Sequence, residues 1–200
     1  MTRTPDPRPL AERIRIEKVE TLADDWAVLK KTTLSFQRGD GAWQLLTRET
    51  YDRGNGATVL LFDRSRRTVL LTRQFRYPAF VNGASDLLTE ACAGLLDARS
   101  PETTIQAEIE EELGVKIANV TKIFESYMSP GSVTEKLFFF VAEYTTADRT
   151  SGGGGLAHEG EDIEVLELPF DDALAMIDAG QIVDGKTIML LLYARWKQLM

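Results

Sequence analysis

The alternation of apolar and polar residues divides the 200-residue chain into two unequal parts. Residues 1–53 carry short alternating stretches at 13–22, 26–36 and 43–51, with the turn-forming sequence QRGDG between the last two. Alternation with a period of two is typical of strands that bury one face. This part therefore predicts a small antiparallel β meander, which cannot support a hydrophobic core alone.

Residues 54–200 carry longer apolar runs. Four runs rich in apolar or β-favouring residues and bounded by turns predict strands, at 57–62, 68–75, 136–144 and 163–170. Helical spacing predicts three helices, at about 101–113, 170–179 and from 186 to the C-terminus. The sequence SGGGG at 151–155 predicts a flexible loop by composition. We therefore expect a strand-rich core with few helices.

The first predicted helix carries an unusual acidic stretch, EIEEELGV, at residues 108–115. Its ends are well marked, because Ser100 is a suitable N-cap, Pro101 suits the first helical position and Gly114 suits the end. At about 100° per residue, Glu108 and Glu112 project together beside the buried edge of the helix. The apolar stripe at that edge consists of Ile105, Ile109 and Leu113, and Glu110 and Glu111 point away from it.

Two carboxylates spaced four residues apart on a helix repel each other by about 0.2–0.5 kcal/mol. A divalent cation between Glu108 and Glu112 would reverse the sign of that interaction. The alternative interpretation is a solvated acidic surface, which is what most charge runs are.

Composition narrows the possible functions. The net charge of −8 argues against non-specific binding of nucleic acid, which requires a basic surface. No apolar run approaches a membrane span, and the N-terminal residues lack the apolar centre of a signal peptide. A single cysteine, Cys92, and a single histidine, His158, exclude Cys-rich and multi-His metal sites, and we assign neither a role. We expect a cytoplasmic protein.

Residues 91–115, ACAGLLDARSPETTIQAEIEEELGV, resemble the signature of the Nudix hydrolases. The matching positions are Gly94, Glu108, Ile109, Glu111, Glu112, Gly114 and Val115. The chain departs from the signature where Ser100 stands in place of the first glutamate and Ala107 in place of the arginine. The spacing between the glycine and the helix is also one residue short. The missing arginine puts the rate in doubt more than metal binding.

Further stretches resemble the branch of that family that splits GDP-mannose and ADP-ribose-type substrates, at 48–62, 69–83, 127–144, 159–170 and 184–193. The resemblance implies an α/β fold, the Nudix α/β/α sandwich with a mixed sheet, over residues 54–200. It also implies a small N-terminal antiparallel β domain at residues 1–53, exchanged or packed across a homodimer.

The resemblance implies a divalent cation, Mg²⁺ with Mn²⁺ as the alternative. Carboxylates are natural ligands for Mg²⁺, which prefers oxygen donors. The implied ligands are Glu108, Glu112 and the backbone carbonyl of Ala93. Glu161 is implied as ligand or catalytic base, with Glu159 as the runner-up for the base, and Glu111 assists through a bound water.

Substrate contacts follow from the same resemblance. Arg76 is the implied pyrophosphate contact, and its planar guanidinium suits bidentate recognition of phosphate oxygens. The alternatives are a surface ion pair for Arg76 and a core position for Trp26. The remaining implied contacts are Gly94, Leu95, Glu135 and Lys186, and, approaching from the other subunit, Trp26, Arg48 and Glu49.

The implied activity is Mg²⁺-dependent hydrolysis of the pyrophosphate bond of a nucleoside diphosphate sugar, with GDP-mannose split into GMP and mannose 1-phosphate. Hydrolysis of ADP-ribose is the first alternative. A second is a nucleotide-binding domain without turnover, which Ser100 and Ala107 favour and which the retained Glu108, Glu112 and Glu161 oppose.

Overall fold

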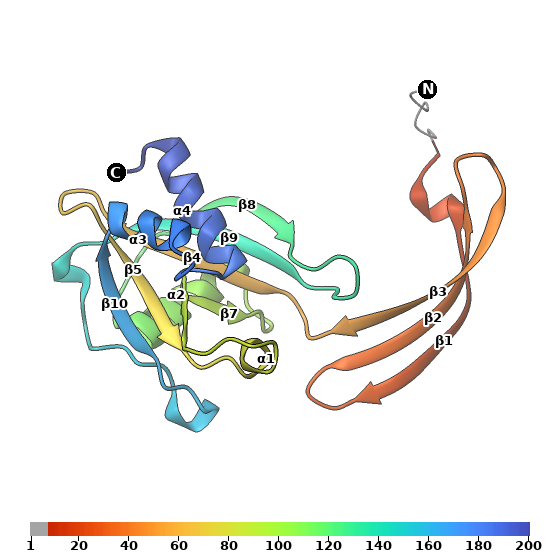
Figure 1. Ribbon diagram of the computed structural model, residues 1–200, viewed down its shortest axis with the longest axis horizontal. Coiled ribbons are helices and arrows are strands. Elements are labelled where there is room, and N and C mark those ends of the chain that lie inside the picture. Colours follow the sequence, from red (N-terminus) through yellow and green to blue (C-terminus); the bar gives the residue numbers. More distant parts are fainter. Residues whose placement is uncertain (1–7) are drawn as a thin grey trace. The chain divides into compact units, whose positions relative to one another are not determined.

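The computed structural model describes residues 8–200 and separates into two compact units (Figure 1). The first unit holds the described residues through Gly54 together with Tyr127–Glu135. The second unit holds Asn55–Ser126 and Lys136–Met200. The chain passes from one unit to the other more than once, because residues 127–135 return to the first unit.

The first unit is a three-stranded antiparallel sheet in the order β1-β2-β3, as the alternating pattern predicts. Its elements are η1 (Leu10–Arg13), β1 (Ile14–Asp24), β2 (Val28–Gln37) and β3 (Trp43–Asp52). The register places Ile16, Leu34 and Leu46 side by side across the three strands. Residues 127–135 join this sheet at Tyr51, whose N–H donates to the Ser132 carbonyl at 2.8 Å.

The second unit contains a seven-stranded mixed sheet. Its main order is β10-β5-β4-β9-β8, with β6 paired to β5 and β7 paired to β4. Strands β4 and β9 run parallel, whereas β5 is antiparallel to both β4 and β10. The strands are β4 (Gly56–Asp63), β5 (Thr68–Gln74), β6 (Leu88–Glu90), β7 (Ala93–Leu95), β8 (Thr121–Tyr127), β9 (Lys136–Glu143) and β10 (Glu164–Pro169).

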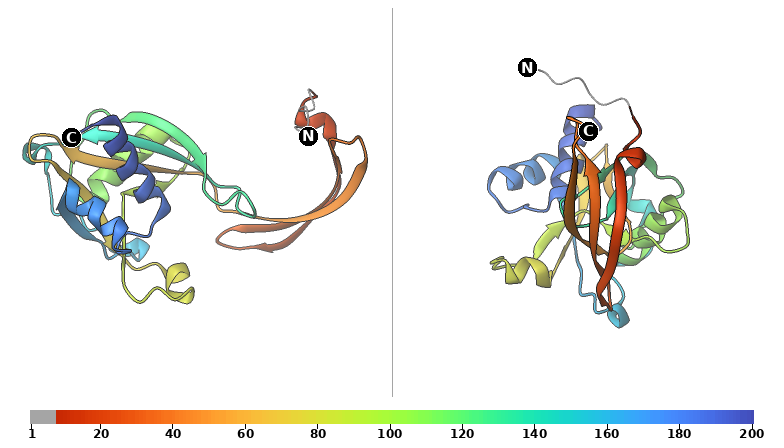
Figure 2. Two further views of the ribbon diagram at one scale, coloured as in Figure 1. Left: turned by 45° about the horizontal axis from the view of Figure 1, so that its top comes forward. Right: turned by 90° about the vertical axis from the view of Figure 1, so that its right-hand side faces the viewer.

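Helices cover both faces of this sheet, which gives the three layers of an α/β/α sandwich. Helix α2 lies on one face, and α3 and α4 lie on the other (Figure 2). The helices are α1 (Tyr77–Val81), α2 (Pro101–Leu113), α3 (Phe170–Asp178) and α4 (Gly185–Lys197), with 3₁₀ turns η2 (Thr146–Asp148) and η3 (Ala157–Glu159). Within residues 8–200, no helix has the length and apolar character of a membrane span.

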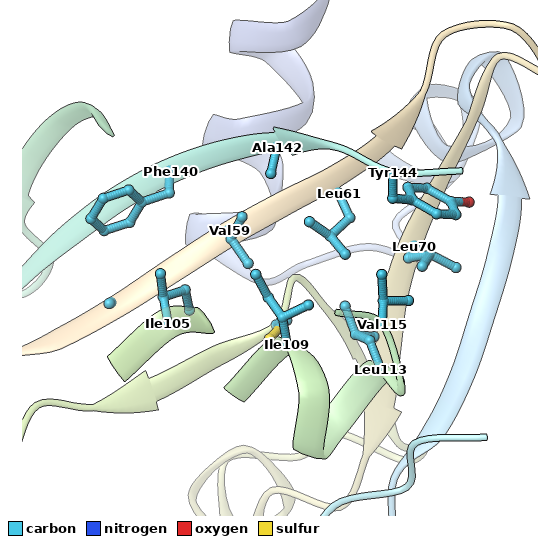
Figure 3. Close-up of a cluster of buried hydrophobic side chains, with 12 residues drawn as sticks. Val59, Leu61, Leu70, Ile105, Ile109, Leu113, Val115, Phe140, Ala142 and Tyr144 are labelled. Carbon is cyan, nitrogen blue, oxygen red and sulfur yellow. The ribbon is translucent and has the colours of Figure 1, made fainter. Parts of the chain in front are cut away.

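The core between the sheet and α2 forms around the predicted apolar stripe. Ile105, Ile109 and Leu113 are fully buried and meet Val59 and Leu61 of β4 (Figure 3). Burying one such side chain contributes about 1.5–3 kcal/mol relative to leaving it in water. This contact therefore fixes the rotation of α2 and decides which of its glutamates face the sheet.

The three long helices and the four predicted strands of the second unit lie where the pattern predicts them, with β10 at the edge of the sheet. The elements that the pattern misses are short or lie at an edge: α1, β6, β7 and β8. Strands of three residues, such as β6 and β7, are too short to show a period. They exist because neighbouring strands provide their hydrogen-bond partners.

Candidate active site

Local capping determines where α2 begins and ends. The Ser100 hydroxyl accepts a hydrogen bond from the Thr103 N–H at 3.2 Å, and Pro101 occupies the first turn. Gly114 ends the helix in the left-handed conformation, with φ of 66°. The departure from the Nudix signature at Ser100 thus has a structural role as the N-cap.

The glutamates of α2 divide between the sheet side and the solvent. Glu112 is only 2% exposed and Glu108 is half-buried, whereas Glu110 and Glu111 are exposed. Helical spacing predicts this arrangement. Gly94 on β7 makes room for Glu108, because a Cβ atom at position 94 would overlap the Glu108 carboxylate.

The surroundings of Glu112 disfavour its negative charge. Burial, together with the charges of Glu108 and Glu161, raises the pKa of Glu112 to about 8, although hydrogen bonds from Cys92 and the Ala93 N–H act to lower it. The Ala93 N–H donates to Glu112 Oε2 at 3.3 Å. A buried carboxylate faced by two others gains from a nearby cation.

Cys92 contacts this site although its sequence suggests no role. The thiol is fully buried, and burial together with the Glu112 charge raises its pKa well above the usual range. It therefore acts as a neutral hydrogen-bond donor to Glu112. Among the side chains that the structure describes, no three acidic, histidine or cysteine residues already form a metal-binding group.

Two predicted phosphate contacts, Arg76 and Lys186, meet at one carboxylate. Glu90, which is 3% exposed, accepts hydrogen bonds from Arg76 Nε at 2.8 Å and Arg76 Nη2 at 3.3 Å. It also pairs with the Lys186 ammonium, whose second partner is Asp184 at 3.0 Å. The Arg76 side chain is itself 42% exposed, so Arg76 forms an ion pair at the surface with a buried partner, and its role as a pyrophosphate contact stays a prediction.

The electrostatics connect this cluster to the acidic residues. Burial opposes the charge of Arg76, but hydrogen bonds and charge from Glu90, then the charges of Glu112 and Asp184, raise its pKa. Arg76 therefore lies within the electrostatic field of Glu112. Burial opposes ionisation of Glu90, yet Lys186 and Arg76 lower its pKa.

Sequence reasoning missed Glu90. The available signal is a single glutamate in the apolar run LLTEACAGLL, which places a charged residue in a buried strand. Its partners are 14 and 96 residues away in the chain, so the sequence alone does not identify them.

Glu161 follows the glycine run, and its carboxylate accepts a hydrogen bond from the Leu156 N–H at 2.8 Å. The composition of residues 151–155 predicts a flexible loop, but the structure places this loop against the end of α2. The N–H groups of Gly154 and Gly155 donate to the carbonyls of Glu112 and Glu111, at 2.9 and 3.2 Å. The Glu159 side chain, the alternative base, lies outside the part of the loop that the structure describes.

The other predicted contacts divide between the units. Leu95 is 42% exposed on β7, beside Ala93 and Gly94 of the second unit. In the first unit, Glu135 is 8% exposed and accepts a hydrogen bond from Arg53.

The remaining contacts, Trp26, Arg48 and Glu49, also belong to the first unit. Trp26 is 66% exposed, so within this chain its interpretation as a core residue is wrong. Arg48 and Glu49 line an open cavity of about 720 Å³ together with Tyr127 and residues 130–134.

Comparison with protein families identifies two regions. Residues 13–51 match the GDP-mannose pyrophosphatase NudK N-terminal domain. Residues 52–191 match the NUDIX domain, and so cover most of the chain.

Individual relatives match along nearly the whole chain. A GDP-mannose pyrophosphatase of Pectobacterium atrosepticum is 53% identical over 186 residues, which are 92% of this chain and 95% of the relative. The proteins of the same name from Klebsiella pneumoniae and Escherichia coli O1:K1 are 50% and 49% identical, over 94% and 96% of this chain and 94% and 100% of the relatives. A crystal structure of an ADP compounds hydrolase shares the fold, with a TM-score of 0.68, 19% identity and 92% of each chain covered.

Proposed function

Because the chain belongs to the Nudix hydrolase family, we propose that it hydrolyses the pyrophosphate bond of GDP-mannose and releases GMP and mannose 1-phosphate. Three relatives named GDP-mannose pyrophosphatase, 49–53% identical over at least 92% of the chain, support this substrate. The observation that carries the proposal is that Arg76 lies within the electrostatic field of Glu112, whose neighbour on the same helix face is Glu108. A diphosphate needs both cationic groups and metal-binding carboxylates.

The residues present fit a divalent cation. Glu112 is buried, its pKa is raised to about 8, and Glu108 and Glu161 add to the negative field around it. We propose that Mg²⁺, with Mn²⁺ as the alternative, is held by Glu108, Glu112, Glu161 and the Ala93 carbonyl. Once bound, such an ion neutralises phosphate charge and acidifies water.

Arg76 and Lys186 orient the substrate diphosphate in this proposal. Their charges are held in place by Glu90, so little side-chain freedom is lost when phosphate oxygens arrive. The guanidinium offers two parallel N–H donors to one phosphate. The backbone of Gly94 and Leu95 lines the same side of the site, where a side chain at position 94 would displace Glu108.

In this proposal, a glutamate in the loop after the glycine run accepts the proton of the attacking water. Water attacks phosphorus and loses a proton to Glu161, or to Glu159 as the alternative, while the bond between phosphorus and the bridging oxygen breaks. Glu111 is exposed at the end of α2, which suits an indirect contact through water.

We propose that the N-terminal β domain, residues 1–53, binds a second copy of this chain and completes the nucleotide site. The apolar row Ile16, Leu34 and Leu46 crosses a sheet on which Ile16 is 58% exposed. Such a surface is typical of an interface. Trp26, Arg48, Glu49 and Glu135 would then contact the nucleotide, the first three from the partner subunit. We place this dimer in the cytoplasm, where the buried thiol of Cys92 stays reduced.

A coupled assay tests the activity. The protein is incubated with GDP-mannose or ADP-ribose, with Mg²⁺, Mn²⁺ or chelator, and an added phosphatase then releases phosphate from the monoester products only. We expect a metal-dependent signal that is strongest with GDP-mannose. A stronger signal with ADP-ribose would support the same reaction but change the preferred substrate to one with an adenine base. Silence from folded protein on both substrates would favour a nucleotide-binding domain without turnover.

A further inference from the structure

The glycine run between β9 and β10 lies against the end of α2. We propose that Gly153, Gly154 and Gly155, here called the glycine bracket, act as positioning residues that fix Glu161 opposite Glu112. This inference rests on the proposed function, because it assigns a purpose to the position of the proposed base relative to a proposed metal ligand.

The first observation is a set of hydrogen bonds between the loop and the last turn of α2. Gly154 N–H donates to the Glu112 carbonyl at 2.9 Å, and Gly155 N–H donates to the Glu111 carbonyl at 3.2 Å. The N–H groups of Thr150 and Ser151 both donate to the Gly114 carbonyl, at 2.7 and 3.2 Å. The last carbonyls of a helix lack partners within the helix, so the loop provides them.

The second observation is that side chains do not fit at two of these positions. Gly153 has φ of 67°, and a Cβ atom there would overlap the backbone carbonyl of Glu112. Gly155 has φ of 75°, and a Cβ atom there would lie 2.5 Å from Glu161 Oε2. The left-handed conformation and the close approach both require glycine.

The third observation is that the loop closes on itself where it reaches Glu161. The Gly154 carbonyl accepts from the Ile163 N–H at 3.2 Å, and Leu156 N–H donates to Glu161 Oε2 at 2.8 Å. Gly154 therefore bonds the helix through its N–H and the far side of the loop through its carbonyl. The carboxylate of Glu161 is held on the same frame as Glu112, whose pKa it raises.

Alanine substitutions at adjacent glycines provide a matched test. Gly155→Ala displaces the Glu161 carboxylate, and Gly153→Ala pushes the bracket off the Glu112 carbonyl. Gly152→Ala is the control, because no atom lies within 4 Å of a Cβ at that position and its φ is outside the left-handed region. We expect kcat to fall by on the order of 10²-fold in both bracket variants, with KM changed by less than about threefold. The control should retain wild-type kinetics.

A double-mutant cycle with Glu161→Gln separates positioning from general damage. If the bracket acts through Glu161, Gly155→Ala should lower kcat little further in the Glu161→Gln background. Equal losses in both backgrounds would overturn the proposal. So would bracket variants as active as Gly152→Ala. If circular dichroism shows that Gly155→Ala is unfolded, Gly153→Ala replaces it in the double-mutant cycle with Glu161→Gln.

Binding of Mn²⁺, followed by electron paramagnetic resonance, gives a readout that does not depend on turnover. We expect the bracket variants to bind Mn²⁺ about 10–100-fold more weakly than Gly152→Ala, because they misplace proposed ligands. Wild-type protein that binds Mn²⁺ but cleaves neither substrate would contradict the proposed function. The Mn²⁺ affinities of the bracket variants would still test this inference in that case. Unchanged Mn²⁺ affinity together with unchanged kcat in the bracket variants would reject the inference alone.

Discussion

The two sheets of this chain differ in how they bury their apolar residues. In the second unit, Val59, Leu61 and Leu70 are fully buried on a sheet that carries helices on both faces. In the first unit, Ile16 is 58% exposed and Leu45 is 68% exposed on a sheet whose unit contains no α-helix among its described residues. Both are β-sheets, but the second buries these apolar side chains within one copy of the chain, whereas the first leaves Ile16 and Leu45 exposed.

This difference predicts different roles for the two units in the proposed activity. A small sheet with two open faces buries too little apolar area to offset the entropy lost on ordering it. The second unit can therefore hold charged groups at fixed positions, whereas we propose that binding a second copy of the chain fixes the residues of the first unit. We expect chemistry to depend on the second unit and substrate affinity to depend on assembly through the first.

The largest effect should come from Glu112→Gln, which removes a proposed metal ligand from the second unit without disturbing the hydrophobic core of that unit. Loss of a metal ligand removes several kcal/mol of transition-state stabilisation, so kcat should fall about 10³-fold. The urea midpoint of the metal-free protein at pH 7 should not fall, because the pKa of Glu112 is raised to about 8 and glutamine resembles the neutral carboxyl form that then predominates. The coupled phosphate assay and urea unfolding measure the two quantities.

Glu110→Gln is the matched control for that experiment, since Glu110 is exposed on the same helix. It should leave kcat and the urea midpoint unchanged. Wild-type turnover in Glu112→Gln would overturn the assignment of Glu112 as a metal ligand.

The next effect should come from Glu90→Gln, which removes the ionised partner that Arg76 and Lys186 share. Removing one member of a buried ion pair costs about 3 kcal/mol in the free energy of unfolding. We expect KM to rise more than kcat falls, because the cations lose their orientation. The pKa of Glu90 is lowered by Lys186 and Arg76, so its stabilisation is present above the ordinary value of 4.5 and lost as pH falls below it.

Glu143→Gln provides the comparison, because Glu143 is exposed and lies 3.9 Å from Arg64. It should change the free energy of unfolding by less than about 0.5 kcal/mol. Equal stability of Glu90→Gln and Glu143→Gln would show that the buried cluster does not organise the site.

Much of the second unit can be predicted because its signals are local. The ends of α2 follow from Ser100, Pro101 and Gly114, and burial of Ile109 follows from spacing within the helix. Helical spacing also distinguishes Glu112, on the sheet side of α2, from Glu111, on its solvent side. These features depend on residues within four positions of one another, so sequence suffices.

The rest depends on contacts between distant residues. Glu90 looks like an isolated polar residue until strands and helices bring Arg76 and Lys186 to it. The glycine run looks mobile by composition, because composition carries no information about the α2 carbonyls that it meets. Exposure of Trp26 could not be predicted either, since the alternating pattern places Trp26 in a strand, whereas the structure places it in the connection between β1 and β2.

A charge placed in the apolar row of the first unit should disrupt the proposed dimer interface. Ile16→Glu should weaken the proposed dimer by about 30-fold or more, because interface residues near the centre contribute about 2 kcal/mol or more. Sedimentation velocity over a dilution series measures the change. The free energy of unfolding of the second unit should not change, since Ile16 is absent from its core.

Leu192→Glu is the control for that substitution. Leu192 is 52% exposed on α4, in the second unit, and so resembles Ile16 in size and exposure. It should leave the oligomeric state of the wild-type protein unchanged. If Leu192→Glu dissociates the dimer and Ile16→Glu does not, the second unit would be the interface.

The smallest effect compares one turn from each unit. Asp63 ends β4 and is 4% exposed, and its carboxylate accepts hydrogen bonds from Ser65 Oγ at 2.7 Å and Arg66 Nε at 2.6 Å. Asp40 lies in the turn between β2 and β3, exposed and 3.5 Å from Arg38. At pH 7, Asp63→Asn should lower the free energy of unfolding by about 1.5 kcal/mol, and Asp40→Asn by less than about 0.5 kcal/mol.

Acidification should shrink only the larger of these two differences. Hydrogen bonds from Ser65 and then Arg66 hold the pKa of Asp63 well below its ordinary value of 3.8. The stabilisation is therefore complete above that value and is lost as pH falls through it toward the folded-state pKa. Urea unfolding at pH 6 and pH 3 should show wild type and Asp63→Asn converging at the lower pH. A constant gap would mean that hydrogen-bond geometry, and not charge, stabilises this turn of the second unit.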